Sequence, residues 1–324
     1  MCVQTDVYRP DFRARWERFV KAANNGTVFH RQKFLDYHPA DRFRSHHLIF
    51  RRKNRILALL PGVIREVKGA KHFISHAGAS YGGFVVSPRL GVHESHLVVG
   101  AFIDFLRKGH FRRVELTPPP LCYNAQLTNH IDFALLKHGF GYVKRELTSV
   151  VPLPPLEKDV FTSFKSEART ATRRAQKLGV VIRESDDYED FYNILRQNLR
   201  MRHNVAPTHT LEEILHLKSL LPEEIRLFSA YFGDQQIAGV VLFACNPSVI
   251  LAFYISHRQE FQKYRSLNLL FHHLMDWGRQ HGFKFLDFGT FTLNMEPNWG
   301  LGKFKETFGA KGIFRDTLYL DLSP

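Results

Sequence analysis

The sequence has few cysteines and no long hydrophobic segment. Its three cysteines, Cys2, Cys122 and Cys245, are an odd number without CxxC or other ligand-like spacing, so neither a disulfide framework nor a structural zinc site is predicted. The longest apolar run, Ile237 to Cys245, is about half of the roughly 20 residues that a membrane-spanning helix needs, and the N-terminus lacks the hydrophobic stretch of a signal peptide. We therefore expect a cytoplasmic protein without a transmembrane segment.

Nucleotide-binding and metal-binding motifs are also absent. Gly78, Gly82 and Gly83 do not have the spacing of a dinucleotide fingerprint, and the segment 300–303 is not a Walker loop. The sequence has 18 histidines, but His-Glu-Ser-His at 93–96 lacks the separation that places two imidazoles on one helical face. We expect no metal ion and no permanently bound cofactor.

What the sequence does have is an ordinary globular composition and an excess of positive charge. Apolar residues make up 44% and charged residues 23% of the chain, which argues against a disordered or low-complexity protein. The 45 Lys and Arg residues against 31 Asp and Glu residues give a formal net charge of +14. Such a charge attracts phosphates, nucleic acid or anionic lipid headgroups and does not choose among them.

Hydrophobic periodicity predicts an α/β (α+β) chain with two domains. In the first half we expect helices near 16–20, 29–38, 93–108 and 127–137, and strands at 47–50, 56–64, 113–116 and 141–151. In the second half we expect helices at 161–178, 188–203, 211–220 and 267–281, a short segment at 301–308, and strands at 180–183, 225–232, 237–244, 249–255, 283–288 and 313–320. A proline-rich stretch after residue 151 predicts the boundary between domains 1–151 and 152–324.

Four segments of the second half occur in a recognisable order. The arginine-rich sequence SEARTATRRAQKLG within 161–179 is followed by strands and then by RSLN at 265–268, which precedes an amphipathic helix. FLDFG at 285–289 and WGLGKFKETFGA at 299–310 follow. This organisation resembles the FemABX-like branch of the GNAT acyltransferase superfamily.

The resemblance implies a fold and a reaction. It implies two tandem GNAT-like domains, each a mixed, mainly antiparallel sheet flanked by helices, with the acyltransferase site in domain 152–324. The implied reaction moves an acyl group from acyl-CoA, or an aminoacyl group from tRNA, to an amine of a cell-envelope (peptidoglycan) precursor, a sugar or a peptide. Such a reaction needs a positioned neutral amine, proton removal and oxyanion stabilisation, and it needs no nucleophilic triad.

The donor site is expected where the basic loop meets the amphipathic helix. A helix N-terminus binds phosphate, and the loop occupies the position of the GNAT pyrophosphate loop but lacks its glycine-rich sequence, which leaves both donors open. The expected phosphate-binding residues are Lys263, Arg265, Ser266, Asn268, Arg169, Arg173, Arg174 and Lys303. The alternative interpretation is a capped helix with solvated basic faces.

The remaining candidates concern catalysis and the acceptor. The resemblance suggests Lys305, in Phe-Lys-x-x-Phe, as the cation that faces phosphate or developing carbonyl charge, with Lys303 as the alternative. Asp287 ends a predicted central strand. Tyr254, Glu260 and Glu296 are candidates for proton transfer, and the predicted acceptor contacts are Tyr81, Gly82 and Trp299. Each of these residues also has a purely structural interpretation.

Two hypotheses without catalysis remain. One is a nucleic-acid-binding protein that uses Arg9, Arg13, Arg51, Arg52, Arg112, Arg113 and the arginine-rich helix, with some of the 43 aromatic residues as stacking platforms. The other is a peripheral protein that an anionic membrane holds by a basic face, which is compatible with catalysis on a lipid-linked acceptor.

Overall fold

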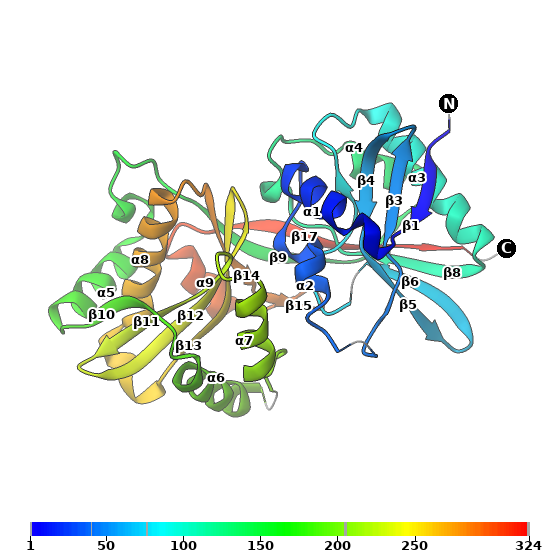
Figure 1. The fold of residues 1–324 in the computed structure, drawn as a ribbon. Helices are drawn as coiled ribbons and strands as arrows, with labels where there is room; N and C mark the ends of the chain where they lie inside the picture. Colours follow the sequence, from blue (N-terminus) through cyan, green and yellow to red (C-terminus); the bar gives the residue numbers. More distant parts are fainter. Residues whose placement is uncertain (1, 40, 76, 204–205, 323–324) are drawn as a thin grey trace. The chain divides into compact units, whose positions relative to one another are not determined.

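The computed structural model describes residues 2–39, 41–75, 77–203 and 206–322, the side chains of 201–203 excepted. The chain divides into two compact units, of which the first comprises Met1–Glu146 with Phe314–Pro324 and the second comprises Leu147–Ile313. The chain passes between them in β9 (Gly141–Pro152) and β17 (Lys311–Asp321) (Figure 1).

The first unit contains two sheets, with strand orders β1-β3-β4-β7 and β17-β8-β6-β5-β2. The strands are β1 (Gln4–Val7), β2 (Arg44–Ser45), β3 (Leu48–Arg52), β4 (Arg55–Leu60), β5 (Gly62–Val67), β6 (Ala70–Ser75), β7 (Val85–Val86) and β8 (Phe111–Leu116). The helices are α1 (Arg13–Ala22), α2 (Gln32–Leu35), α3 (Val92–Lys108) and α4 (His130–Lys137), with 3-10 turns η1 (Pro10–Phe12), η2 (Val28–His30) and η3 (Leu121–Tyr123).

A buried histidine fixes the glycine-containing loop of the first unit. His30 is fully buried, and its Nε2 lies 2.8 Å from the carbonyl oxygen of Gly82. Its own carbonyl oxygen accepts a hydrogen bond of 2.7 Å from the indole of Trp16. Burial lowers the pKa of His30 to about 4, so the ring is neutral near pH 7. The loop around Gly82 is therefore a packed part of the core.

The second unit is built on a six-stranded sheet with the order β10-β11-β12-β13-β14-β9. Its pairs are antiparallel except for the parallel pair β13–β14. The strands are β10 (Val181–Ser185), β11 (Ile225–Phe232), β12 (Gln235–Asn246), β13 (Val249–His257) and β14 (Phe285–Thr290), with a separate hairpin of β15 (Thr292–Leu293) and β16 (Glu296–Pro297). The helices are α5 (Ser166–Lys177), α6 (Tyr188–His203), α7 (Leu211–Leu220), α8 (Ser266–Gln280) and α9 (Trp299–Glu306), with 3-10 turns η4 (Val160–Ser163) and η5 (Gln259–Tyr264).

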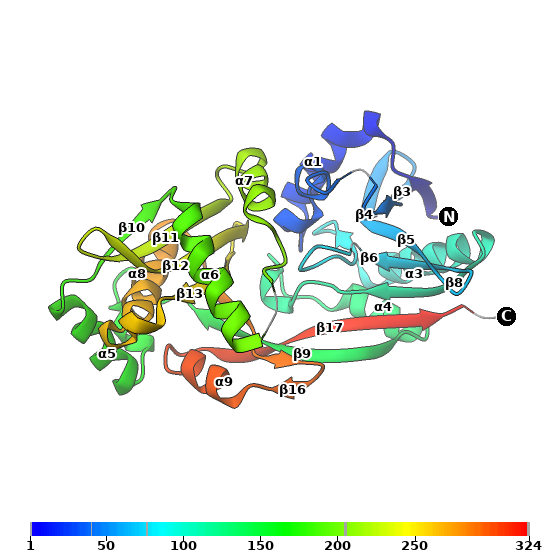
Figure 2. The same ribbon diagram turned by 90° about the horizontal axis from the view of Figure 1, so that it is seen from below.

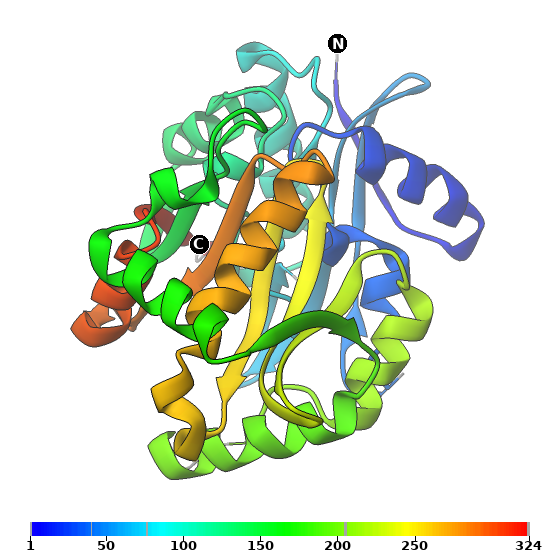
Figure 3. The ribbon, with the colours of Figure 1, turned by 90° about the vertical axis from the view of Figure 1, so that its left-hand side faces the viewer.

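Helices cover both faces of this sheet. Val240 of β12 belongs to the core cluster that includes Leu270 and Leu274 of α8. Its neighbour Gly239 points the other way, where an added Cβ would lie 2.5 Å from Phe191 of α6, so α6 packs closely against that position. Figure 3 shows α8 along the strands with α5 beside it, and Figure 2 shows α6 across the other face.

The predicted fold class is confirmed, and most predicted elements appear close to their expected positions. The single strand predicted at 56–64 is wrong, because Pro61 cannot donate a ladder hydrogen bond and divides it into β4 and β5, which belong to different sheets. The predicted boundary at residue 151 lies near the observed one at 146/147. However, residues 314–324 belong to the first unit, because β17 pairs with β8 through Leu318–Asp321.

Candidate functional site

The parallel strands β13 and β14 pair over only part of their length. The pairing joins Val249–Leu251 to Phe285–Asp287, and β13 then continues through Ala252–His257, about 20 Å of extended backbone. The register of β13 against β12 shifts at Phe253, which marks a β-bulge, and a bulge bends and twists its strand. Beyond Leu251 one edge of β13 is therefore not used by β14.

After β13 the chain passes through η5 to the N-terminus of a long helix. Arg265 is the N-cap residue of α8 and has φ 56° and ψ 32°, without a side-chain cap. This left-handed conformation is the one that glycine adopts readily and that costs other residues energy. The basic loop thus has the backbone shape that a glycine would provide. The first backbone N–H groups of α8 form a site suited to an anion.

Two charged residues share the turn that ends β14. Lys305 is buried, and its Nζ donates hydrogen bonds to the carbonyl oxygens of Gly289 (2.8 Å) and Thr290 (2.9 Å). Asp287 is also buried and accepts a hydrogen bond of 2.8 Å from the Gly289 N–H and one from the hydroxyl of Thr148. Burial lowers the pKa of Lys305 to about 8, and the carboxylate of Asp287 opposes this shift. Lys305 therefore remains mostly an ammonium at pH 7.

A tyrosine and a histidine meet just beyond the end of the β13–β14 pairing. The hydroxyl of Tyr254 accepts a hydrogen bond of 3.0 Å from the backbone N–H of His209 and lies 2.8 Å from Nδ1 of the same residue. Both side chains are buried, and the ring of Tyr192 packs against Tyr254. Burial raises the pKa of Tyr254, and the His209 N–H opposes the shift. The pair can therefore pass a proton between oxygen and nitrogen.

Comparison with known proteins finds one family model and several similar folds. Residues 162–304 match the model of the acetyltransferase (GNAT) domain. The fold is similar to the crystal structure of FemX (13% identity, 98% of this chain and 97% of that chain, TM-score 0.74) and to L-PGS from Bacillus licheniformis (12%, 98% and 94%, TM-score 0.61). It is also similar to a tandem GNAT protein from the clavulanic acid biosynthesis pathway (10%, 99% and 99%, TM-score 0.56). A search of curated proteins found no match.

The GNAT match lies within the second unit, and the fold of the chain is similar to that of FemX. Both the tandem arrangement and the mixed sheets of its units agree with the resemblance seen in the sequence.

The predicted donor residues of the second unit differ in exposure. Lys263 and Arg265 are exposed beside the start of α8, whereas Ser266 and Asn268 are buried in its first turn. Lys303 is exposed on α9. The role of each of these residues stays a prediction.

The arginine-rich helix of the second unit has a solvent-exposed basic face. Arg169, Arg173 and Arg174 of α5 are all exposed, and Arg173 lies over the ring of Phe161 at 5.2 Å. The exposed face is available to an anionic partner, and its binding role stays a prediction.

The other predicted catalytic and acceptor residues are either exposed or packed within their own unit. Glu260 on η5 and Glu296 on β16 are exposed, and the structure gives neither a buried environment that would tune a proton-transfer group. Trp299 is 77% exposed at the start of α9. In the first unit, Tyr81 is packed between aromatic rings and Gly82 is closed in by Ser75. Their acceptor roles stay predictions.

Sequence reasoning missed His209. The residue lies in the segment before α7, next to the capping residue Thr210, and it belongs to no motif that marks catalysis. Its importance arises from the fold, which returns this segment to β13. The sequence therefore offered no usable signal for it.

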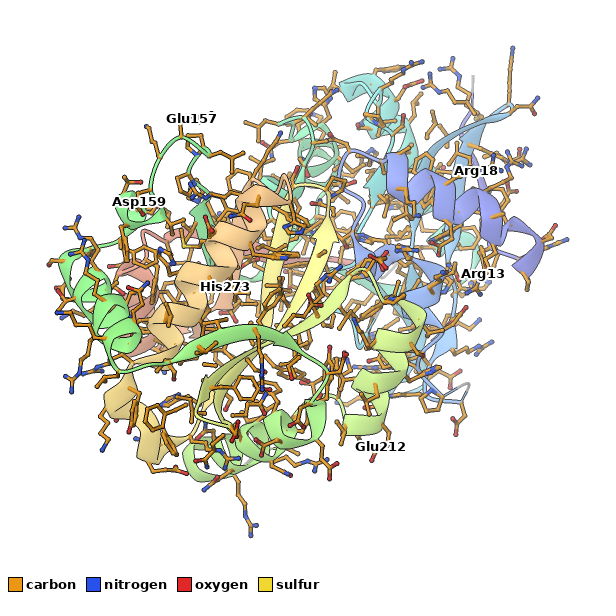
Figure 4. The ribbon with its side chains drawn as sticks, turned by 60° about the vertical axis from the view of Figure 1, so that its left-hand side comes forward. Arg13, Arg18, Glu157, Asp159, Glu212 and His273 are labelled. Carbon is orange, nitrogen blue, oxygen red and sulfur yellow. The ribbon has the colours of Figure 1, made fainter. Side chains whose placement is uncertain are left out.

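The excess positive charge belongs to the first unit. That unit has 25 Lys and Arg residues against 13 Asp and Glu residues, a formal net charge of +12, whereas the second unit has 20 against 18, a charge of +2. Of the arginines proposed for nucleic-acid binding, Arg13, Arg51, Arg52 and Arg113 form ion pairs with carboxylates. Figure 4 shows Arg13 and Arg18 on α1.

Neither a metal centre nor a membrane-spanning helix is found in the described part of the chain. Among the described residues no group of three or more His, Cys, Asp or Glu side chains is arranged to hold a metal ion. The helices of the described ranges do not combine the length and the apolar composition that crossing a bilayer requires.

Proposed function

We propose that the second unit transfers an acyl group from acyl-CoA to an amine. The observation that carries this proposal is that β13 continues beyond its pairing with β14, and that the chain then passes through η5 to the N-terminus of α8, where Arg265 provides no side-chain cap. The pantetheine arm of coenzyme A has amide groups that can pair with a strand edge, and the pyrophosphate of coenzyme A suits a helix N-terminus. The GNAT domain match over 162–304 supports acyl transfer as the reaction class.

In this proposal Lys305 and Tyr254 each act on one of the two negative charges that the reaction develops, on the carbonyl oxygen and on the leaving sulfur. The amine nitrogen forms a bond to the thioester carbon, the C–S bond breaks, and one proton is lost from nitrogen to water. The Lys305 ammonium, whose two carbonyl partners fix its position, stabilises the negative charge that develops on the carbonyl oxygen. Tyr254 donates its hydroxyl proton to the leaving thiolate and recovers a proton through His209.

In this proposal the positive charge of the first unit attracts the acceptor. Its charge of +12 favours an acceptor that carries phosphate or another anionic group next to its amine. A cell-envelope precursor, a sugar or a peptide meets this requirement if it carries a phosphate.

A second candidate donor, aminoacyl-tRNA, is favoured by one observation. The arginines of α5 are exposed along one side of the helix, and a row of cations suits an RNA backbone. Both donors place phosphates near the same loop, so a binding experiment must compare them.

The donor assignment is tested with the Arg265→Gly variant. Glycine adopts the left-handed conformation at lower cost, so we expect an unchanged or higher melting temperature. Loss of the guanidinium should weaken acyl-CoA binding by about tenfold, since a charge-assisted contact to phosphate is lost. Calorimetric titration with acetyl-CoA and longer acyl-CoAs measures the affinity, and thermal shift reports the linked stabilisation.

Lys68→Gly is the matched control. Lys68 also has a positive φ, 50°, in the β5–β6 turn of the first unit, so this variant removes a similar cation from a similar conformation, and we expect no change in donor affinity. If charged tRNA binds saturably and acyl-CoA does not bind, aminoacyl-tRNA would replace acyl-CoA as the donor. Binding of neither would overturn it.

A further inference from the structure

A short segment of the second unit exposes four large apolar side chains. Leu293, Met295, Trp299 and Leu301 are 73%, 57%, 77% and 38% exposed. The first two belong to the β15–β16 hairpin and its turn, and the other two to the first turn of α9. We call these four residues the α9 tip. Exposed apolar groups this close together indicate an interaction surface.

The fold holds the α9 tip rigidly. The side-chain oxygen of Asn298 caps α9 by accepting a hydrogen bond of 3.0 Å from the Leu301 N–H, and the Asn298 N–H donates to the carbonyl oxygen of Phe291 (2.8 Å). Gly302 is buried, and an added Cβ there would lie 2.9 Å from the Phe291 ring. The inner face of α9 is therefore packed while Trp299 stays in solvent.

Cations continue from the α9 tip along the neighbouring helix. Lys303 is exposed one helical turn after Trp299. The far end of α9 contacts the start of α5, since the Lys165 N–H donates to the carbonyl oxygen of Thr307 (2.7 Å) and its Nζ lies 3.5 Å from the Glu306 carboxylate. Figure 3 shows α5 and α9 on the same side of the second unit.

The charge of the second unit is concentrated on these two segments. Residues 161–179 and 299–311 together have eight Lys and Arg residues against two Asp and Glu residues. The rest of the unit has 12 against 16, a net negative charge. We call the exposed Lys165, Arg169, Arg173, Lys177 and Lys303 the α5–α9 cationic strip.

We infer that the α9 tip and the α5–α9 cationic strip form a docking surface for an anionic lipid bilayer. The cations match the charge of anionic headgroups, and the apolar tip matches the boundary between headgroups and acyl chains, where Trp is preferred. RNA also matches the cations. However, three of the four tip residues are aliphatic and cannot stack on bases, so the tip favours lipid over RNA.

Docking would place the acyltransferase unit next to lipid-linked substrates. This last step rests on the proposed function, and its substrate class is an amine on a lipid or on a lipid-linked phosphate precursor. The docking surface itself does not depend on acyl transfer, so the two proposals are tested separately.

The experiment uses the full chain and vesicles of phosphatidylcholine alone or mixed with phosphatidylglycerol, without any acyl donor. Trp16 and Trp277 are buried or half-buried, so Trp299 is the exposed tryptophan that reports insertion. We expect sedimentation with the anionic vesicles and a blue shift of the fluorescence, both weakened by high salt. Brominated lipids should quench the signal.

The variant Leu293→Ser/Met295→Ser keeps the tryptophan reporter and should lower the vesicle partition coefficient about tenfold or more, since burial of apolar groups contributes to interfacial binding. The matched control is Leu127→Ser/Phe133→Ser, which removes two exposed apolar residues of the first unit (80% and 59% exposed) and should bind as the wild type does. Calorimetric titration of each variant with acyl-CoA reports the donor site independently.

Two outcomes overturn the docking proposal. One is equal binding of wild type, tip variant and control to both kinds of vesicle, which would mean that the tip does not direct binding. The other is retention of RNA at low salt with no binding to anionic vesicles, which would assign the cationic strip to nucleic acid. In either case a normal acyl-CoA titration would leave the proposed acyl transfer standing.

Discussion

Lys305→Met is expected to lower kcat by two to three orders of magnitude. The loss of a fixed charge at a developing oxyanion has this size, and the buried Lys305 ammonium is held at two carbonyl oxygens, which limits its movement. Methionine keeps most of the side-chain volume. It leaves the Gly289 and Thr290 carbonyls without a donor but removes a buried charge, so these two effects on stability oppose each other. Steady-state kinetics beside a thermal melt separates activity from stability.

The pH dependence gives this prediction a second test. The pKa of about 8 predicts that the Lys305 contribution to turnover falls as the pH rises through 8. The unfolded chain keeps the ordinary lysine value of 10.5. Between pH 8 and 10.5 it therefore binds a proton that the folded protein has released, and the free energy of unfolding should rise with pH by on the order of 3 kcal/mol. Both effects should be missing in Lys305→Met.

Lys303→Met serves as the comparison on the same helix. Lys303 is exposed, so we expect its loss to raise KM more than it lowers kcat, as for a contact made equally in the ground and transition states. If Lys305→Met retains wild-type kcat and the same alkaline limb, the Lys305 ammonium only holds the end of β14 in place.

The regular elements of the second unit were largely predictable. α7 begins with Thr210 and Glu213, which form a capping box, and the sequence pattern marks such a start directly. β11 is a buried apolar strand and was predicted with its observed bounds. In the first unit, by contrast, the prediction of one strand at 56–64 was wrong. The hydrophobic pattern continues across Pro61, so it does not show that the chain leaves one sheet and enters another there.

The pairing partner of the last strand was not predictable. β17 follows the second unit in sequence, but Leu318–Asp321 pair with β8. A strand pattern shows which side chains face a core and does not show which partner strand provides that core. Non-local pairing of this kind appears only in the structure.

The candidate site was partly predictable. The motifs pointed to Lys305 and Asp287, and the structure brings both to the turn at Gly289. Two properties were beyond the sequence: the burial that lowers the pKa of Lys305, and the left-handed backbone of Arg265. Because the loop has no glycine, its sequence did not predict a left-handed residue. In the structure Arg265 adopts that conformation.

Tyr254→Phe is expected to lower kcat by about a hundredfold with little change in KM, because general acid catalysis contributes on this scale. The variant removes the hydroxyl that meets His209 at 2.8 Å and leaves the ring packing against Tyr192. His209→Asn keeps a polar atom near the position of Nδ1 but cannot exchange a proton near neutral pH, so we expect an intermediate loss and a changed pH profile. Steady-state kinetics over a pH range measures both.

A change of leaving group separates proton donation from structural support. An acyl donor whose leaving thiol has a low pKa needs no proton when the C–S bond breaks, so it should restore much of the turnover of Tyr254→Phe if Tyr254 is the general acid. The control is Tyr188→Phe, which removes another buried hydroxyl of the same unit from α6 and should behave as the wild type with either donor. A loss in Tyr254→Phe that is equal for good and poor leaving groups would assign the Tyr254–His209 pair to the support of β13, because a residue that only positions the strand has no reason to distinguish one leaving group from another.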